Sequence, residues 1–294
     1  MPTSTATNTT DNVFRLRDGR ALGYAEYGDP AGTPVFFFHG SPGSRLQRHP
    51  DTSIAGELSA RIITIDRPGY GLSNFQPERT LLNWPADVAQ LADALHIDRF
   101  AAIGLSGGGP YLLACAYAMP QRLTAAIVVS GMGPLDEPDA LEGVMPSLQL
   151  GLGIVRRAPW LARLALEPAA RLLRLNPVAI KKLVPVSMPK VDQVAFAQPS
   201  IQAVDREDLT EAYRHGGLGL YWEVVILTHP WGFRLQDIHT KIHLWHGEQD
   251  TTVPARLARY VARTLPDCET HFYPGEGHTL IYHYWRKILA VAVS

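Results

Sequence analysis

Strand-like and helix-like segments alternate through the first 130 residues, and this alternation constrains the fold more than any other feature. Apolar runs of strand length occur at residues 21–28, 34–40, 61–66, 99–105 and 123–131. Helical periodicity occupies residues 80–97 and 108–120. Strands that alternate with helices form a parallel sheet covered by helices on both faces. The sequence therefore predicts an α/β fold with a mostly parallel central sheet.

The alternation stops after about residue 134 and resumes near residue 236. The intervening segment is helical, is interrupted by prolines and contains no clear buried strand. Strand and helix signals then return at 241–247, 255–265, 268–278 and 280–293. We expect a core formed by residues 14–134 and 236–294, a helical insertion at 135–235, and a flexible polar tail at 1–13.

Composition narrows the function classes. The 294 residues are 46% hydrophobic and carry a formal net charge of −1, so no overall field favours nucleic acid or an anionic membrane. No apolar stretch is long enough to span a bilayer, and the N-terminus lacks the pattern of a signal peptide. Cys115 and Cys268 fit no metal-binding spacing and are expected to be free thiols. We expect a cytoplasmic protein that acts on a small molecule, without metal or cofactor and without a nucleic-acid partner; a homodimer stays open.

A basic stretch lies within the predicted insertion. Residues 151–190 contain eight Lys or Arg against one acid, Glu167. One interpretation is a basic surface close to an anionic substrate or lipid. The other is a set of solvated helix faces.

One serine lies between glycines at the junction of a strand and a helix. The segment Gly104-Leu105-Ser106-Gly107-Gly108 fits G-x-S-x-G, in which a strained turn exposes the serine hydroxyl. Bulky side chains two positions before or after the serine would clash, and both positions are glycine. A phosphate-binding glycine loop is the alternative, but the dinucleotide spacing and the Walker lysine are missing.

Five motifs, in this order, resemble those of the α/β-hydrolase fold family: "FFFHGSPGS", "IDRPGYGLS", "GLSGGG", "HGEQDTTVP" and "GEGH". The resemblance covers about residues 14–294. It implies the α/β-hydrolase fold, with a helical cap inserted after the sixth strand that roofs the site.

A serine hydroxyl needs a base to become a nucleophile. The resemblance places that base at His278, in a glycine-rich loop after the last predicted strand. It is chosen from eleven histidines, and the competing positions considered are His39, His246, His271 and His283.

The base needs a carboxylate to fix its tautomer and offset its developing charge. Asp250 follows a predicted strand, and the order Ser106, Asp250, His278 matches the order of the triad in this fold. Other acids at suitable places are Glu248, Asp136 and Asp139.

Two backbone N–H groups are expected to stabilise a tetrahedral oxyanion. One belongs to Gly107, directly after the nucleophile, and the other to Ser41, directly after the His39-Gly40 pair. Asp66 and Arg67 carry chemically capable groups, but we expect them to hold the shape of their loop.

Serine at position 106 separates the chain from relatives of this fold that use aspartate or cysteine there. The resemblance implies a serine hydrolase that cleaves a carboxylic ester, thioester or lactone, or a C–C bond, of a moderately large apolar substrate through an acyl-enzyme. The sequence "HGSPG" and Gly107 depart from the proline iminopeptidase pattern. A perhydrolase or haloperoxidase-type activity, a lyase and a non-catalytic small-ligand receptor stay open. We expect the substrate to contact Leu105, Tyr221, Trp222 and Trp231; the alternative for the aromatic residues is that they pack the cap on the core.

Overall fold

The computed structural model describes residues 8–135, 142–144, 146–175 and 188–294. Its strands form one eight-stranded sheet in the order β1-β2-β4-β3-β5-β6-β7-β8. The strand bounds are β1 Thr9–Arg15, β2 Ala21–Gly28, β3 Thr33–Phe38, β4 Ala60–Ile65, β5 Phe100–Leu105, β6 Leu123–Val129, β7 Ile242–Gly247 and β8 Cys268–Tyr273. Strand β2 is antiparallel to both β1 and β4, and the remaining pairs are parallel. The predicted α/β fold with a mostly parallel sheet is confirmed.

Helices follow most of the parallel strands. The α-helices of the described residues are α1 Ser53–Glu57, α2 Trp84–Ala94, α3 Gly109–Ala118, α4 Pro146–Arg157, α5 Pro159–Leu175, α7 Lys190–Ala197, α8 Pro199–Ala212, α9 Leu218–Leu227, α10 Ala255–Thr264 and α11 Leu280–Val293. Short 3₁₀ turns are η1 Leu81–Asn83, η2 Ser106–Gly108, η3 Pro120–Arg122 and η4 Leu235–Asp237. No helix among these residues is both long enough and apolar enough to cross a bilayer.

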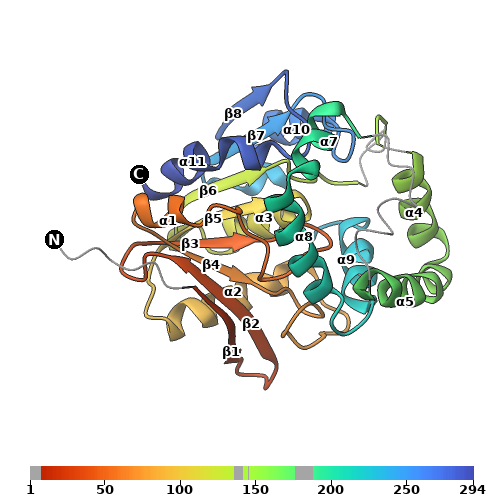
Figure 1. Cartoon of the computed structure of the whole chain (residues 1–294), viewed down its shortest axis with the longest axis horizontal. Coiled ribbons are helices and arrows are strands. Elements are labelled where there is room, and N and C mark those ends of the chain that lie inside the picture. Colours follow the sequence, from red (N-terminus) through yellow and green to blue (C-terminus); the bar gives the residue numbers. More distant parts are fainter. Residues whose placement is uncertain (1–7, 136–141, 145, 176–187) are drawn as a thin grey trace.

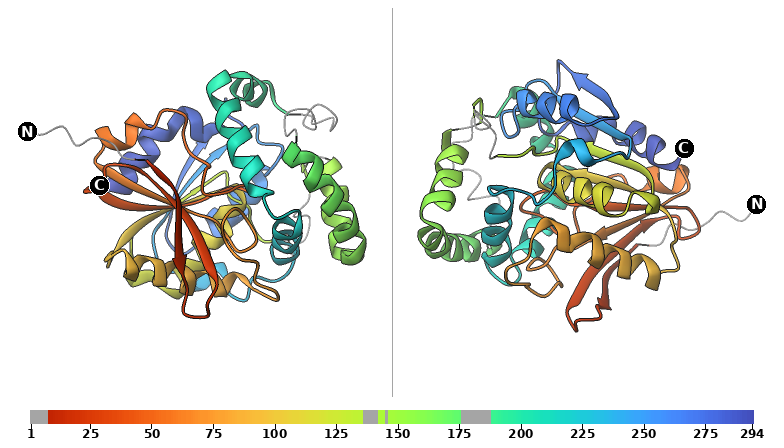
Figure 2. Two further views of the ribbon diagram at one scale, coloured as in Figure 1. Left: turned by 60° about the horizontal axis from the view of Figure 1, so that its bottom comes forward. Right: turned by 180° about the vertical axis from the view of Figure 1, so that it is seen from behind.

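The sheet lies between two apolar layers. Helices α2, α3 and α10 pack on one face with Phe36, Phe38 and the aliphatic side chains of β5 and β6. Helices α1 and α11 cover the other face, where Phe37 meets Trp285 at a ring-centroid distance of 6.0 Å. Figures 1 and 2 show these two faces from the front and from behind. All six residues of β5 are buried, because this strand lies in the middle of the sheet and is covered on both sides.

Two boundaries differ from the sequence expectation. Residues 9–13, expected in the tail, belong to β1, and Asp11 on this strand pairs with Arg45 at 2.6 Å. The strand was missed because its polar side chains alternate between half-buried and exposed at the edge of the sheet. Strand β8 ends at Tyr273, five residues before the predicted end, and the Pro274-Gly275 pair that follows forms a turn.

Five described helices, α4, α5, α7, α8 and α9, lie between β6 and β7 in the sequence. We refer to them as the inserted helices. They lie together at one side of the molecule, in green to cyan, while α11 and the C-terminus lie toward the other side (Figure 1). The carboxyl ends of β5 and β7 carry the predicted nucleophile and acid, so the edge of the sheet formed by these ends is where the site residues gather.

Candidate active site

The turn that follows β5 carries Ser106 in a strained backbone conformation. Its φ is +51°, in the left-handed region that costs a non-glycine residue about 1–3 kcal/mol. The chain can turn this sharply because residue 104 is glycine: a Cβ there would lie 2.6 Å from the carbonyl oxygen of Gly108. Ser106 lies at the start of η2 and is 8% exposed as a residue.

Asp250 and His278 form a close acid–base contact at this edge of the sheet. The His278 Nδ1–H donates to Asp250 Oδ2 across 2.7 Å. The other oxygen, Oδ1, accepts the backbone N–H groups of Thr252 and Val253 at 2.8 Å each. Both oxygens of the carboxylate are therefore held by hydrogen bonds. Because Asp250 binds Nδ1–H, Nε2 is the ring nitrogen that can accept a proton.

The environment of His278 tunes its charge. Burial lowers its pKa, but the charge and hydrogen bond of Asp250 and the charge of Asp192 raise it more, so the pKa lies above its ordinary value. A carboxylate partner stabilises the imidazolium that a proton-accepting histidine becomes.

The competing acids and bases are engaged elsewhere. Glu248 pairs with Arg259 at the surface. Both ring nitrogens of His39 are used, since Nδ1 donates to the Gly40 carbonyl and Nε2 accepts the N–H of Arg67. His246 donates from Nε2 to the Val253 carbonyl at 2.8 Å.

His283 and His271 also lie against glutamates rather than against Asp250. The ring of His283 pairs with Glu276 at 2.8 Å, and that of His271 lies 3.3 Å from Glu269. Asp136 and Asp139 lie outside the described residues.

The segment after β6 links the serine turn to the histidine loop. Its Met132 N–H donates to the Ser106 carbonyl, and the Ser130 hydroxyl donates to the His278 carbonyl, each at 3.1 Å. Ser130 itself has a φ of +46°. Residues 130–132 thus contact both loops, although Ser106 and His278 lie 172 positions apart in the sequence.

The loop after β3 packs directly against the serine turn. A Cβ on Gly107 would lie 1.9 Å from Ser41 Oγ, and one on Gly40 would lie 3.6 Å from Ser106 Cβ. The two residues predicted as oxyanion donors, Ser41 and Gly107, are therefore neighbours. Glycine at 107 is required by this close approach.

Arg67 is hydrogen-bonded to that loop. Its guanidinium donates to the carbonyls of His39 and Gly40, and to Ser41 Oγ at 3.2 Å. Its Nε lies 2.7 Å from Glu223 Oε1 on α9, and both side chains are fully buried. These contacts describe the loop-shaping role that the sequence suggested for Arg67.

Asp66 is likewise committed to backbone and to Arg45. It accepts the N–H groups of Arg45 and Leu72 at 2.6 and 2.8 Å, and its Oδ2 is 3.1 Å from Arg45 Nη1. Burial raises the pKa of Asp66 to about 6, against the opposing charge of Arg45. Every contact named here serves the shape of the loop.

Two of the three aromatic residues that we expected to contact the substrate, Trp222 and Trp231, lie in packing positions. Trp222 donates from its indole N–H to the Arg79 carbonyl at 3.0 Å, and Trp231 is 5% exposed in the apolar core. Tyr221 lines a groove between α5 and α9 on the inserted helices. The contacts of both tryptophans agree with the alternative stated above, in which the aromatic residues pack the insertion on the core.

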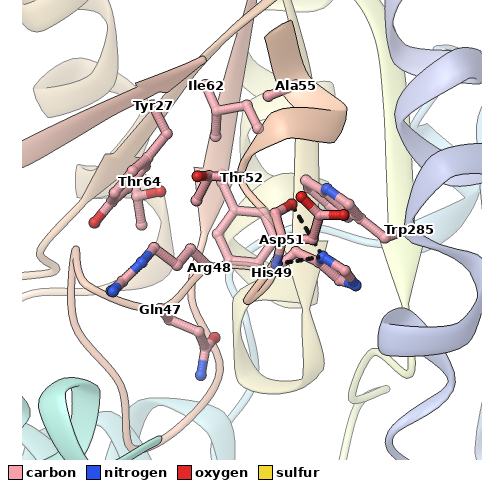
Figure 3. Close-up of a pocket in the computed structure, with 11 residues that line it drawn as sticks. Tyr27, Gln47, Arg48, His49, Asp51, Thr52, Ala55, Ile62, Thr64 and Trp285 are labelled. Atoms are coloured by element: carbon pink, nitrogen blue, oxygen red, sulfur yellow. Dashed lines mark hydrogen bonds between the residues drawn. The ribbon is translucent and has the colours of Figure 1, made fainter. Parts of the chain in front are cut away.

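Leu105 lies between the core and a small cavity that also touches Gln47 and Tyr282. The neighbouring cavity in Figure 3, lined by His49 and Trp285 among others, has a volume of about 20 Å³, which is room for one water. In Figure 3 the ring of His49 lies beside Trp285, and the two rings are stacked at 6.2 Å. Neither cavity could hold an ester substrate.

The basic stretch is described in part. Arg156, Arg157, Arg163, Arg171 and Arg174 are exposed on α4 and α5, and residues 176–187 lie outside the described part of the chain.

Three buried carboxylates on the inserted helices contact the core loops, and sequence reasoning missed all of them. They are Asp192 on α7, Asp208 on α8 and Glu223 on α9. Asp208 accepts the N–H and hydroxyl of Ser44 and the amide of Gln47, whose own oxygen accepts the Gly40 N–H at 2.6 Å. No local pattern marks these acids, because their partners lie far away in the sequence.

Comparison with known proteins gives the family. A family model described as alpha/beta hydrolase family matches residues 35–291. A non-heme chloroperoxidase from Streptomyces lividans is 35% identical over 121 residues, which cover 40% of this chain and 44% of the relative. A proline iminopeptidase from Xylella fastidiosa is 33% identical over 125 residues, covering 40% and 38%. The chain thus spans less than half the length of these curated relatives.

Among solved structures, an esterase from Exiguobacterium antarcticum aligns with a TM-score of 0.67 at 16% identity, covering 96% of this chain and 99% of the esterase. This likeness shows the fold alone. The family model, in contrast, matches well over half of the chain. The protein belongs to the alpha/beta hydrolase family.

Proposed function

We propose that the protein is a serine hydrolase that cleaves a carboxylic ester, thioester or lactone through an acyl-enzyme. The observation that carries the proposal is the 2.7 Å contact between His278 and a doubly anchored Asp250, at the sheet edge where Ser106 sits on its strained turn. This is the acid–base pair that a serine nucleophile requires.

In the first half-reaction, His278 Nε2 accepts the hydroxyl proton while Ser106 Oγ forms a bond to the substrate carbonyl carbon. The resulting oxyanion is stabilised by the N–H groups of Ser41 and Gly107, whose residues are neighbours. The C–O or C–S bond then breaks, and His278 returns the proton to the leaving alcohol or thiol. In a lactone the leaving alcohol stays attached to the acyl group.

In the second half-reaction, water gives a proton to His278 and attacks the acyl carbon. The ester bond to Ser106 breaks, the serine oxygen regains the proton, and the carboxylic acid leaves. Asp250 keeps Nδ1 protonated throughout, so Nε2 is the atom that exchanges the proton.

The test combines labelling and kinetics. A fluorophosphonate probe is expected to label the wild type at Ser106 and to leave Ser106→Ala unlabelled, while the variant keeps the wild-type circular dichroism. Turnover of p-nitrophenyl esters should fall by a factor of about 10³ or more in the variant. Tight binding of a small apolar ligand without labelling would instead identify a receptor.

The same panel defines the acyl group. We expect apolar esters of moderate size to be preferred over acetyl esters, with Leu105 at the acyl side of Ser106. A higher kcat/KM for acetyl esters than for longer or aromatic ones would exclude this substrate class while leaving the serine chemistry intact.

A second candidate is perhydrolysis, favoured by the likeness to the chloroperoxidase from Streptomyces lividans. Here hydrogen peroxide takes the place of water in the second half-reaction and yields a peracid. Bromide oxidation that requires both peroxide and a carboxylic acid, and that is lost in Ser106→Ala, would support it. The same assay without a carboxylic acid is the control.

A further inference from the structure

The loop that carries His278 is held by a residue of the inserted helices. Asp192, near the start of α7, is 2% exposed. Its Oδ2 accepts the backbone N–H of His278 at 3.1 Å, and its Oδ1 accepts the N–H and the hydroxyl of Thr279 at 2.9 and 2.7 Å. One carboxylate therefore receives three hydrogen bonds from two consecutive residues of the catalytic loop.

The fit at this contact is close. A Cβ on Gly277 would lie 2.3 Å from Asp192 Oδ2, so the loop backbone lies directly against the carboxylate. Thr279 is also the residue that precedes α11, so the negative charge lies at the N-terminal end of that helix, where it is favoured. A neutral or shorter side chain would leave buried N–H groups without an acceptor.

Asp192 is also one of the two carboxylates whose charge acts on His278, and the other is Asp250, which binds Nδ1. Behind Asp250 lies the titratable ring of His246, with its Nε2 3.6 Å from Oδ2; burial lowers the pKa of His246 and favours its neutral form. Glu276, on the same loop, pairs with His283 instead. The two carboxylates hold different parts of His278: Asp250 binds its ring, and Asp192 binds its backbone N–H.

We propose that Asp192 is a positioning residue for the catalytic histidine, so that α7 completes the active site rather than only covering it. This proposal rests on the proposed serine hydrolase function. Asp192 acts through the backbone of His278 and through its charge, and it touches no reacting atom. An enzyme whose α7 separates from the core would hold Ser106 correctly and lack an oriented base.

The test compares Asp192→Asn with Glu207→Gln, a half-exposed carboxylate on α8 whose ion pair is with Arg48. In Asp192→Asn the kcat per labelled serine should fall about 10- to 100-fold with KM nearly unchanged. The acid limb of the pH profile should move to lower pH, because imidazolium loses a stabilising charge. Glu207→Gln should match the wild type in all three readouts. Thr279→Val, which removes only the hydroxyl donor, should give a smaller fall in kcat.

A purely structural role predicts fewer labelled serines with an unchanged kcat per labelled site and an unchanged pH profile, and that result would overturn the proposal. A second measurement is independent of activity. In Ser106→Ala, the His278 pKa measured by NMR should fall when Asp192→Asn is added. An unchanged His278 pKa counts against Asp192 even if the serine hydrolase function fails, whereas absence of esterase activity in the wild type counts against that function alone.

A separate cluster of polar side chains lies toward the amino-terminal ends of β7 and β8. His243 lies opposite Glu269 in the strand register, and His271 lies two residues further along β8, so all three side chains share one face. Glu269 Oε2 is 3.6 Å from His243 Nδ1, and Oε1 is 3.3 Å from His271 Nε2. The three donor groups lie within 4.8 Å of one another.

His243 Nδ1 and His271 Nε2 are buried, and neither has a hydrogen-bond partner in the described part of the chain. The ring of His271 is stacked on Trp245, with centroids 4.2 Å apart, which fixes its direction. The two nitrogens approach different oxygens of the Glu269 carboxylate, at 3.6 and 3.3 Å. An ion between the two imidazoles would therefore be bound by both carboxylate oxygens, with zinc–ligand bonds of about 2.0–2.2 Å.

We infer that His243, Glu269 and His271 form a binding site for a borderline divalent cation such as Zn²⁺, with water as the remaining ligand. The Lys241 ammonium competes for this site, since it lies 2.7 Å from Glu269 Oε2. The site ties the edge strand β8 to β7 at the end of the sheet opposite the proposed triad.

Calorimetric titration of the chelator-treated protein with Zn²⁺ tests this. We expect one ion per chain, affinity at least about tenfold lower in His271→Ala, and higher affinity in Lys241→Gln. His283→Ala is the control, because His283 and Glu276 form a pair with no third ligating group close by among the described residues. Equal affinity in His271→Ala and the wild type would overturn the inference, as would Mg²⁺ binding as tight as that of Zn²⁺.

Discussion

Arg67 and Glu223 form a fully buried ion pair, with Nε and Oε1 2.7 Å apart, that joins the core to the inserted helices. Tyr70 donates its hydroxyl to the other oxygen of Glu223. The same arginine donates to the carbonyls of His39 and Gly40, so one side chain connects α9 to the loop of the proposed oxyanion hole.

Breaking this pair on one side should destabilise the protein and displace the loop. For Glu223→Gln we expect a loss of about 3–5 kcal/mol in the free energy of unfolding, because a guanidinium is left buried without its counter-charge. The double variant Arg67→Met/Glu223→Met should recover much of that stability and remain inactive, since the loop carbonyls lose their donor. Urea unfolding and ester turnover measured side by side would separate the two effects, and recovery of activity in the double variant would contradict the role given to Arg67.

Gly107→Ala should impair catalysis while preserving the fold. The new Cβ would lie 1.9 Å from Ser41 Oγ, so either the serine turn or the loop after β3 has to move. The N–H groups of Ser41 and Gly107 would then no longer point at the same oxyanion. Losing one such donor costs a factor of about 10²–10³ in kcat. Adding Ser41→Gly removes the clashing hydroxyl and should restore part of the rate. Wild-type kcat in Gly107→Ala would argue against an oxyanion site at this position.

The pH profile should reflect His278. Its pKa is raised by Asp250 and Asp192 against the effect of burial, and only the neutral imidazole accepts the serine proton. The kcat/KM should therefore fall as the pH drops through a value above 6.5, the ordinary pKa of histidine. A half-maximal pH clearly below 6.5, measured with a substrate that does not titrate, would contradict the assignment of His278 as the base.

Stability should depend on pH through Asp208. Burial raises the pKa of Asp208 to about 8 in the folded chain, although the Ser44 donors oppose the shift, against 3.8 for an ordinary aspartate. The folded state then binds a proton that the unfolded state releases. The contribution of Asp208 to stability is therefore fully present below about pH 4 and is lost as the pH rises from about 4 to about 8, by up to about 1.4 kcal/mol per pH unit. Asp208→Asn should flatten this slope in urea unfolding series, and an equal slope in the variant would exclude Asp208 as its source.

Sequence predicted the parts of the site that depend on local pattern. The run before Ser106 is apolar because β5 is covered on both faces. Gly104 and Gly108 are required by close backbone contacts, and Gly107 by the Ser41 side chain. The aligned carboxyl ends of parallel strands then explain why residues as distant as Ser106 and Asp250 reach one edge of the sheet.

Other parts depend on contacts that no local pattern encodes. Asp192 meets His278 across 86 residues and Asp208 meets Ser44 across 164, and neither aspartate differs in its sequence setting from a solvated helix residue. The grouping of His243, Glu269 and His271 on one face likewise depends on the register between β7 and β8, which is known only from the folded sheet.

The three buried carboxylates of the inserted helices limit how freely this part of the chain can be exchanged. A chimaera that kept the core and took another insertion between β6 and β7 would retain three sets of buried donors that each bind a carboxylate. They are the N–H groups of His278 and Thr279, the polar groups of Ser44 and Gln47, and the guanidinium of Arg67. A graft that brought no acid to them would leave buried donors and a buried cation unmatched. Insertion and core have therefore to be transplanted, or to diverge, as a matched pair.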